Sequence, residues 1–299
     1  LPELRKRIKE EKLPLVIDDS SGMRLVYVAM DNNNPPTNDV HIRRALSWSF
    51  NYDQYIEKIM LGMADRTITN VPKGMWGYDP TVPYYTFNLE KAKQELALAA
   101  PENRAMLEKG IKVTYAPGVG VGMEGFLMWK ADLAKIGVNL ILDEVPFQTW
   151  RDYLRIPGAC RLQDRTWTPD YVDPHTFYAM MHKPYYQAIT FGTTPDWLNA
   201  LLDKAPLQPT REDRLKIYRQ VENCLYENAT FIRICTPLGG NDYNILGAYV
   251  KGYVPHVFPR FKPLFRELWK ELPTASTTKP SSTMISLMPT LTKKELYDY

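Results

Sequence analysis

The sequence has few of the residues on which disulfide and metal sites depend. Its 299 residues include only three cysteines and four histidines. The cysteines lack metal-type spacing, and their odd number leaves at least one unpaired within the chain. The histidines form no H-E-x-x-H motif or similar cluster, so we expect neither a metal site nor a cofactor. The positions concerned are Cys160, Cys224, Cys235, His41, His175, His182 and His256.

An excess of charge of one sign and long apolar runs are also missing. The 37 basic and 34 acidic residues give a net charge of +3, and the charged run RKRIKEEK mixes both signs. Nucleic-acid binding therefore has no support in the composition. No apolar stretch approaches the length of a membrane span, and the opening LPELRKRIKE is not the apolar core of a signal peptide. Either the protein is cytoplasmic, or an amino-terminal part with an export signal lies outside this sequence.

Local signatures of catalysis are missing as well. No serine lies in a nucleophile elbow, and no Cys/His pair has a local signature. The segment GVGVG (118–122) lies between a predicted strand and a predicted helix, but it has neither the G-x-G-x-x-G spacing nor the Lys-Ser/Thr pair of phosphate loops. We expect a flexible strand-to-helix loop there and no enzyme. A cytoplasmic enzyme that uses GVGVG to bind a nucleotide is a remote alternative.

Aromatic residues and proline are plentiful. The sequence is 12% aromatic and contains 24 prolines. Its hydrophobic fraction of 44% is ordinary for a soluble globular protein. Tyrosine and tryptophan suit a wet cleft, because each ring has an apolar face and a polar edge. The aromatic content therefore suits a chain with a wet cleft.

Strand and helix patterns alternate along the chain. This alternation predicts an α/β fold in which helices cover a sheet. Strands are expected at 23–30, 111–116, 138–145 and 231–235. Helices are expected at 1–12, 40–50, 53–61, 89–100, 123–136, 147–156, 194–205 and 211–228, and one more from Pro174. The expected amino-terminal caps are Asn38 or Asp39, Asn88 and Thr210.

The stretch TWTPDYVDP (166–174) sets two carboxylates among aromatics and prolines. Asp173 followed by Pro174 is typical of a turn that opens a helix, but this does not account for Trp167 or Asp170. An aspartate beside aromatics is costly to bury unless it is paired or useful. Trp167 and Asp170 are therefore candidates for a binding site, although core packing is the simpler interpretation of any single aromatic.

Five segments, in order, resemble segments in the carboxy-terminal half of the members of one protein family. This family comprises the extracytoplasmic solute-binding proteins of peptide-type ABC transporters, the dipeptide/oligopeptide/nickel group. The resemblance covers roughly residues 15–270 and departs from the family pattern at Thr166, at Asn51 and at 231–233. The segments are NNNPPTNDVHIRRALSWSFNYDQYI, VPKGMWGYDP with YYTFNLEKAKQELA, LMWKADLAKIGVNLILDEVPFQTW, TWTPDYVDPHTF, and REDRLKIYRQVENCLYENATFIRI.

For the fold, the resemblance implies a lobe like those of the type II periplasmic binding proteins, with a mixed sheet flanked by helices. Residues 1–235 are then expected to form the second solute-binding lobe. Residues 236–272 are expected to cross the hinge back toward a first lobe that this sequence does not contain. Residues 273–299 are rich in Ser, Thr and Pro and are expected to be linker or disordered.

For function, the resemblance implies a non-catalytic component of an ABC importer. It captures di- or oligopeptides between two lobes and delivers them to the membrane permease. In peptide-binding members the aspartate of W-x-x-D-Y pairs with the ligand's α-ammonium group and the tryptophan lines the pocket. By motif position these are Asp170 and Trp167, with Tyr171 beside them. Arg165, one place from a carboxylate-binding arginine of some members, is a fourth candidate ligand-binding residue.

An oligosaccharide-binding member of the same family is the alternative, because aromatic rings stack on sugar faces. The rings concerned are Trp76, Tyr78, Tyr84 and Tyr85. The resemblance also implies an extracytoplasmic location, in the periplasm or on the outer cell surface, either free or tethered to the membrane. The expected partners are the ligand and the permease, with no nucleic acid, and the full-length protein is expected to be a monomer.

Overall fold

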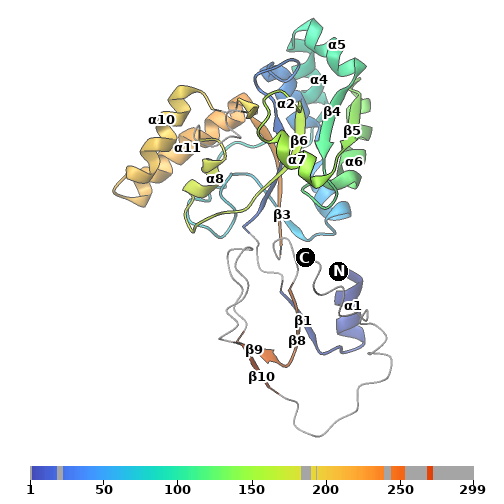
Figure 1. Cartoon of the computed structure of the whole chain (residues 1–299), viewed down its shortest axis with the longest axis vertical. Helices are drawn as coiled ribbons and strands as arrows, with labels where there is room; N and C mark the ends of the chain where they lie inside the picture. Colours follow the sequence, from blue (N-terminus) through green and yellow to red (C-terminus); the bar gives the residue numbers. More distant parts are fainter. Residues whose placement is uncertain are drawn as a thin grey trace.

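The computed structural model describes residues 2–18, 23–182, 190–192, 194–238, 244–252 and 268–271. Figure 1 shows a larger body of helices and strands and a smaller part beside it. In the smaller part β1 pairs with β8, and β9 with β10, both antiparallel. Its elements are α1 (Pro2–Glu10), β1 (Leu15–Asp18), β8 (Asn244–Gly247), β9 (Val250–Lys251) and β10 (Trp269–Lys270). The expected tail at 273–299, and much of the expected crossing segment at 236–272, lie outside the described residues.

Six strands of the larger body form one mixed sheet, in the order β3-β7-β2-β6-β4-β5. Strand β4 is parallel to β5 and β6, whereas β2 is antiparallel to both β6 and β7, and β3 is antiparallel to β7. The strands are β2 (Leu25–Met30), β3 (Ala64–Arg66), β4 (Ile111–Tyr115), β5 (Leu140–Glu144), β6 (Leu162–Trp167) and β7 (Phe231–Pro237). The mixed sheet agrees with the sequence-based expectation.

The parallel strands β4, β5 and β6 end at one edge of this sheet, at Tyr115, Glu144 and Trp167. We call it the carboxyl edge. Strand β7 also ends there, because its neighbour β2 runs the opposite way and begins with Leu25 opposite Trp167. Since β1 precedes β2 and β8 follows β7, the smaller part is joined to the body through the carboxyl edge (Figure 1). Open α/β sheets bind ligands just beyond such an edge.

Each face of the sheet is covered by helices, and β2 shows how the sequence achieves this. Side chains alternate between the faces of a strand. Val26 and Val28 therefore join one hydrophobic cluster, which α2 (Val40–Ser49), α4 (Leu89–Leu98) and α6 (Gly122–Ala134) cover. Leu25 and Tyr27 join a second cluster, which α8 (His175–Ala179), α10 (Asp196–Lys204) and α11 (Arg211–Asn228) cover. Figure 1 shows the two groups of helices on opposite sides of the sheet. A strand that is buried on both faces has a continuous apolar sequence, and LVYVAM, the sequence of β2, is of this kind.

The helices begin at the polar caps that the sequence predicts. Asp39, Asn88 and Thr210 each accept a hydrogen bond from a backbone N–H in the first turn of α2, α4 and α11. The helices of the body are α2 (Val40–Ser49), α3 (Tyr52–Gln54), the π-turn η1 (Tyr55–Ile59), α4 (Leu89–Leu98), α5 (Pro101–Lys109), α6 (Gly122–Ala134), α7 (Phe147–Tyr153), α8 (His175–Ala179), α10 (Asp196–Lys204), the 3₁₀ turn η2 (Ala205–Leu207) and α11 (Arg211–Asn228).

The structure differs from the predicted elements at several points. The helix expected at 53–61 is a single α-turn followed by a π-turn. Helix α8 begins at His175, one residue after the predicted start at Pro174, because the side chain of Asp173 accepts the N–H of His175 at 2.9 Å. Strands β3 and β6 and helix α5 have no predicted counterpart. Of these, β6 matters most, because it leads directly into TWTPDYVDP.

Candidate functional site

The TWTPDYVDP stretch leaves the sheet at the carboxyl edge, where β6 ends at Trp167. The side chain of Trp167 is only 6% exposed and packs in the second hydrophobic cluster with Leu25 and Tyr27. Asp170 and Tyr171 lie on the surface, and Tyr171 is 44% exposed. The structure therefore brings Asp170 and Tyr171 together at the tip of the loop, while Trp167 fixes its base.

Hydrogen bonds hold the tip of this loop. The N–H of Asp170 donates to the hydroxyl of Thr176 at 3.1 Å, and Thr176 is fully buried at the start of α8. The Tyr171 hydroxyl and Nδ1 of His175 are 2.6 Å apart. Burial, together with the nearby His182, lowers the pKa of His175, so this ring is neutral at pH 7. The loop thus presents the Asp170 carboxylate from a fixed backbone, but the carboxylate is exposed, contrary to the expectation of a buried charge.

Arg165 lies on β6, two residues before Trp167 and on the same face of the strand. Its side chain is 2% exposed, and its guanidinium carbon lies 5.2 Å from the centre of the Trp150 ring. Among the residues that the structure describes, no hydrogen-bond acceptor pairs with its Nε or Nη1. A buried cation with unmatched donors is costly. Arg165 is therefore suited to an oxygen-rich anionic group brought by a ligand.

The acidic side chain that is buried beside the aromatics is Asp164, not Asp170. Asp164 is fully buried, and both its carboxylate oxygens accept the N–H of Val121 at 3.0 Å. Burial raises the pKa of Asp164 to about 8. Val121 belongs to GVGVG, so the protein's own carboxylate occupies the place that a phosphate takes in a phosphate loop. The structure thus agrees with the expectation of a strand-to-helix loop, and it leaves the nucleotide alternative without a site.

The four aromatics considered for sugar stacking separate into two pairs. Tyr85 is buried and its hydroxyl donates to the carbonyl of Tyr226, and the Trp76 ring lies 5.0 Å and 4.8 Å from the guanidinium groups of two arginines of α11. Tyr78 and Tyr84 instead line a pocket of about 400 Å³ beside β3. Its other lining residues are Tyr52, Asp53, Asp65, Arg66, Ile68, Lys73, Thr86 and Phe87.

The histidines and cysteines make other contacts. His41 pairs with Glu95 and His182 with Asp203, at 2.7 Å and 2.6 Å. All three cysteines are free thiols in the interior. Within the described ranges, no group of three or more His, Cys, Asp and Glu side chains is arranged to hold a metal ion.

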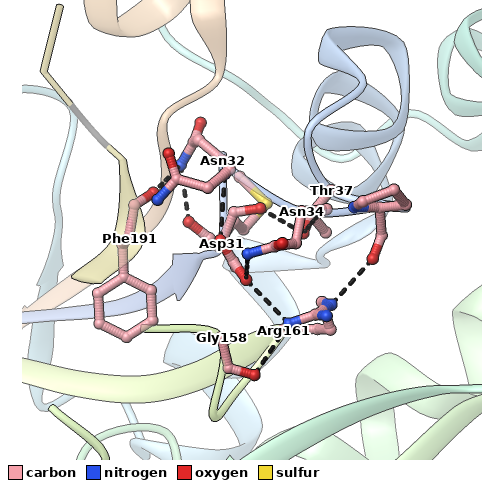
Figure 2. Close-up of polar contacts among 10 residues, drawn as sticks. Asp31, Asn32, Asn34, Thr37, Gly158, Arg161 and Phe191 are labelled. Atoms are coloured by element: carbon pink, nitrogen blue, oxygen red, sulfur yellow. Dashed lines mark hydrogen bonds and ion pairs between the residues drawn. The ribbon is translucent and has the colours of Figure 1, made fainter. Parts of the chain in front are cut away.

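Figure 2 shows a polar network that the sequence reasoning did not single out. The buried Asp31, next after β2, accepts from Arg161 at 2.9 Å and from the side-chain amide of Asn34 at 3.0 Å. The Thr37 hydroxyl donates to the Asp31 carbonyl, and Arg161 also donates to the carbonyl of Pro35. This network lies at the edge opposite the carboxyl edge. It explains the NNNPPT motif as a structural loop rather than a ligand contact.

The comparisons with known proteins agree with this arrangement. Residues 2–188 match the family described as "Bacterial extracellular solute-binding proteins, family 5 Middle". The probable D,D-dipeptide-binding periplasmic protein DdpA of Escherichia coli (strain K12) is 25% identical over 240 residues, which are 78% of this chain and 44% of that protein. Heme-binding protein A of Haemophilus influenzae is 25% identical over 264 residues, 86% and 46% of the two chains.

A solved structure shows the same fold. The dipeptide binding protein of Pseudoalteromonas sp. SM9913, in complex with Met-Leu, superposes with a TM-score of 0.75 at 17% identity over 90% of this chain and 52% of that chain. The chain thus has the fold of the type II periplasmic binding proteins, as expected, and it spans about half the length of the curated relatives it matches. Among its described helices, none is both long and apolar enough to cross a bilayer.

The family match extends over more than half of the 299 residues, and the order of motifs, the mixed sheet and the superposition agree with it. The chain therefore belongs to the bacterial extracellular solute-binding proteins of family 5, which are binding proteins and not enzymes.

Proposed function

We propose that the chain is part of an extracytoplasmic protein that captures di- or oligopeptides and delivers them to the membrane permease of an ABC importer. The observation that carries the proposal is the position of Asp170, an exposed carboxylate on a fixed loop just beyond the carboxyl edge. This is where open α/β sheets bind their ligands. The dipeptide bound in the Pseudoalteromonas structure supports the ligand class.

The proposed site uses four residues in two ways. Asp170 pairs with the α-ammonium group of the peptide, and Arg165 meets a carboxylate. Tyr171 provides aromatic surface that is indifferent to the peptide's side chains, while Trp167 packs in the core and holds the base of the loop. One fixed charge orients the ligand while the aromatic surface adds contact area.

We also propose that the larger body is one of two lobes. The smaller part supports this proposal, because within the described ranges its strands pair only two by two, and such sheets are marginal without further strands. Since β1 pairs with β8, residues 15–18 belong with the segment that follows β7 rather than with the sheet of the body. A first lobe completing these sheets would close over the carboxyl edge.

Asp170→Asn tests the proposal. In the 299-residue chain Asp170 is exposed, so an ion pair there contributes about 0.2–1 kcal/mol, and we expect weak tri-alanine binding to fall by about two- to fivefold. In a protein whose first lobe encloses the ammonium group, the loss should be about 3–5 kcal/mol, a factor of hundreds or more. Calorimetry or NMR titration measures both. Glu102→Gln, an exposed charge change on α5, is the control, and unchanged tri-alanine affinity in Asp170→Asn removes Asp170 from the site.

The pocket beside β3 favours oligosaccharide binding as the second candidate. Tyr78, Tyr84 and Phe87 offer ring faces, and Asp53 and Asp65 offer hydroxyl acceptors, in one cavity of about 400 Å³. Titration with maltotriose distinguishes the two functions. A maltotriose affinity that depends on Tyr78 and changes little in Asp170→Asn would replace the peptide proposal.

A further inference from the structure

The loop that carries Asp170 is fastened to helix α11 at one point. Asp173 forms a bidentate ion pair with Arg214, in which Nη1 donates to Oδ2 at 2.9 Å and Nη2 donates to Oδ1. Bidentate arginine–carboxylate pairs are stronger and geometrically more specific than single hydrogen bonds. Because Asp173 follows Asp170 by three residues, this ion pair fixes the end of the loop close to the proposed ammonium site.

Arg214 is itself held in one position. Its side chain is 15% exposed, and Nη2 also donates to the Tyr218 hydroxyl at 2.8 Å. The guanidinium group lies 4.8 Å from the centre of the Trp76 ring, and the Tyr218 ring stacks on Tyr178 at 4.7 Å. The arginine therefore ties the loop to α11, a helix of 18 residues, so the position of the loop depends on that of the helix.

The segment that contains Trp76 touches the same loop. A Cβ on Gly77 would lie 2.8 Å from Cγ of Pro174, so only glycine allows this approach without displacement. On the other side of the loop, the N–H of Asp170 is bound to Thr176 of α8. Helix α11 and the segment around Gly77, both distant in sequence, thus meet the start of α8 around the residues between Asp170 and Pro174, and Arg214 supplies the ion pair among these contacts.

We infer that Arg214 is a positioning residue for ligand binding: through Asp173 it sets where the Asp170 carboxylate lies, and so sets the preference for ligands with a free α-ammonium group. The inference rests on the proposed function, because it requires Asp170 in the site. Arg214→Lys keeps the charge but cannot form the planar fork. Arg214→Gln removes both the charge and the fork.

The test measures the affinity for a peptide with a free α-ammonium group relative to the affinity for the same peptide without one. A general loss of structure weakens both affinities and leaves their ratio unchanged. Each protein is titrated by NMR with tri-alanine and with N-acetyl-tri-alanine, which lacks the free α-ammonium group. The proteins are the wild-type 299-residue chain, Asp170→Asn, Arg214→Lys, Arg214→Gln, and the double variant with both Asp170→Asn and Arg214→Gln. We expect Arg214→Gln to reduce the affinity ratio of the two peptides by the same factor as Asp170→Asn, about two- to fivefold. The double variant should show no further reduction, because the two residues act as a unit.

Arg219→Gln is the matched control. Arg219 lies on the same helix and pairs with Asp79, so it also ties α11 to the segment after β3, but it does not touch the loop. We expect it to leave the ratio unchanged. If Arg214→Gln weakens both peptides equally, the positioning role is wrong, while the peptide proposal stands. If Asp170→Asn itself leaves the ratio unchanged, both are wrong.

A second measurement needs no ligand, and it uses Arg214→Lys in case Arg214→Gln folds poorly. Amide hydrogen exchange reports the hydrogen bond from the N–H of Asp170 to Thr176. Arg214→Lys, the milder change, should speed exchange at Asp170 by about tenfold, while the amides of α11 beyond the site keep their wild-type rates. Unchanged exchange at Asp170 would overturn the inference.

Discussion

The carboxylate of Asp164 fills the space that a side chain on Gly120 would need. A Cβ on Gly120 would lie 2.0 Å from Oδ1 of Asp164, and the backbone of Gly120 has a φ of +59°. The next residue, Val121, donates its N–H to both oxygens of the same carboxylate. The GVGVG loop is therefore built around a buried side chain of β6, the strand that leads to the candidate site.

Gly120→Ala is expected to destabilise the fold for two reasons. The left-handed backbone costs an L-residue about 1–2 kcal/mol, and the clash with Asp164 adds about 1–3 kcal/mol. Gly118→Ala is the matched control, because Gly118 also has a positive φ of +75°, but a Cβ there would have no atom within 4 Å. Urea denaturation should show the larger loss for Gly120→Ala. Equal losses would mean that the loop moves away from Asp164 at little cost.

Asp164→Asn should change how stability depends on pH. Burial raises the pKa of Asp164 to about 8 in the folded chain, whereas an unfolded aspartate has a pKa of about 3.9. Between these values the folded state holds a proton that the unfolded state releases. The wild type therefore loses stability as the pH rises through this window, by up to about 1.4 kcal/mol per pH unit from this group.

The asparagine resembles the protonated acid and has no such dependence. The free energy of unfolding of Asp164→Asn, minus that of the wild type, should therefore rise from pH 4 to pH 8 and be flat below pH 4. Urea midpoints measured for both proteins at each pH test this. Parallel curves over the whole range would show that Asp164 is not buried as a neutral acid.

Local signals in the sequence were enough to predict much of the fold. Asn88 and Thr210 could be identified as caps because a cap bonds to a backbone N–H within the next turn, and both do so in the structure. Strand β6 could not be identified in this way. Its sequence, LQDRTW, places Asp164 and Arg165 in the interior, and the partners that make this tolerable, Val121 and Trp150, come from other segments.

The candidate site was predicted in part. The position of TWTPDYVDP at the end of a strand follows from the structure, but the motif alone suggested that Trp167 and Asp170 share one buried environment. They do not, because Trp167 is a core residue and Asp170 is exposed. The role of Asp173 was read only as a helix cap. Its second partner, Arg214, is 41 residues away, and no local pattern links the two.

Glu222→Gln tests a buried ion pair in the segment where the chain departs from the family pattern. Arg233, on β7, pairs with Glu222, and the two side chains are 8% and 2% exposed. Glu222 also accepts from the N–H of Asn70 and from the Tyr178 hydroxyl. Removing one charge of such a pair leaves the other unpaired, so we expect a loss of about 3–5 kcal/mol. Thermal melting should show it, whereas Glu212→Gln, exposed on the same helix, should cost about 1 kcal/mol or less.

Arg165→Met tests whether the buried guanidinium serves the ligand rather than the fold. Methionine keeps the length and the contact with the Trp150 ring but removes a cation whose Nε and Nη1 have no acceptor among the described residues. A buried cation whose donors lack acceptors costs free energy, so an apolar side chain of similar length should be neutral or stabilising in its place. The melting temperature of the ligand-free chain should therefore be unchanged or higher. Binding of tri-alanine should weaken, while binding of its C-terminal amide, which lacks the carboxylate, should not.

Arg161→Met provides the contrast, because Arg161 lies next to β6 and pairs with the fully buried Asp31. Its removal leaves that carboxylate without its cation, so the melting temperature should fall, even though Arg161 is the more exposed of the two arginines. Each substitution removes one positive charge, and the two positions are four residues apart. They should nevertheless change the stability of the fold in opposite directions. If Arg165→Met lowers the melting temperature as much as Arg161→Met does, Arg165 is a structural residue, and the carboxylate end of the proposed site must be sought elsewhere along the carboxyl edge.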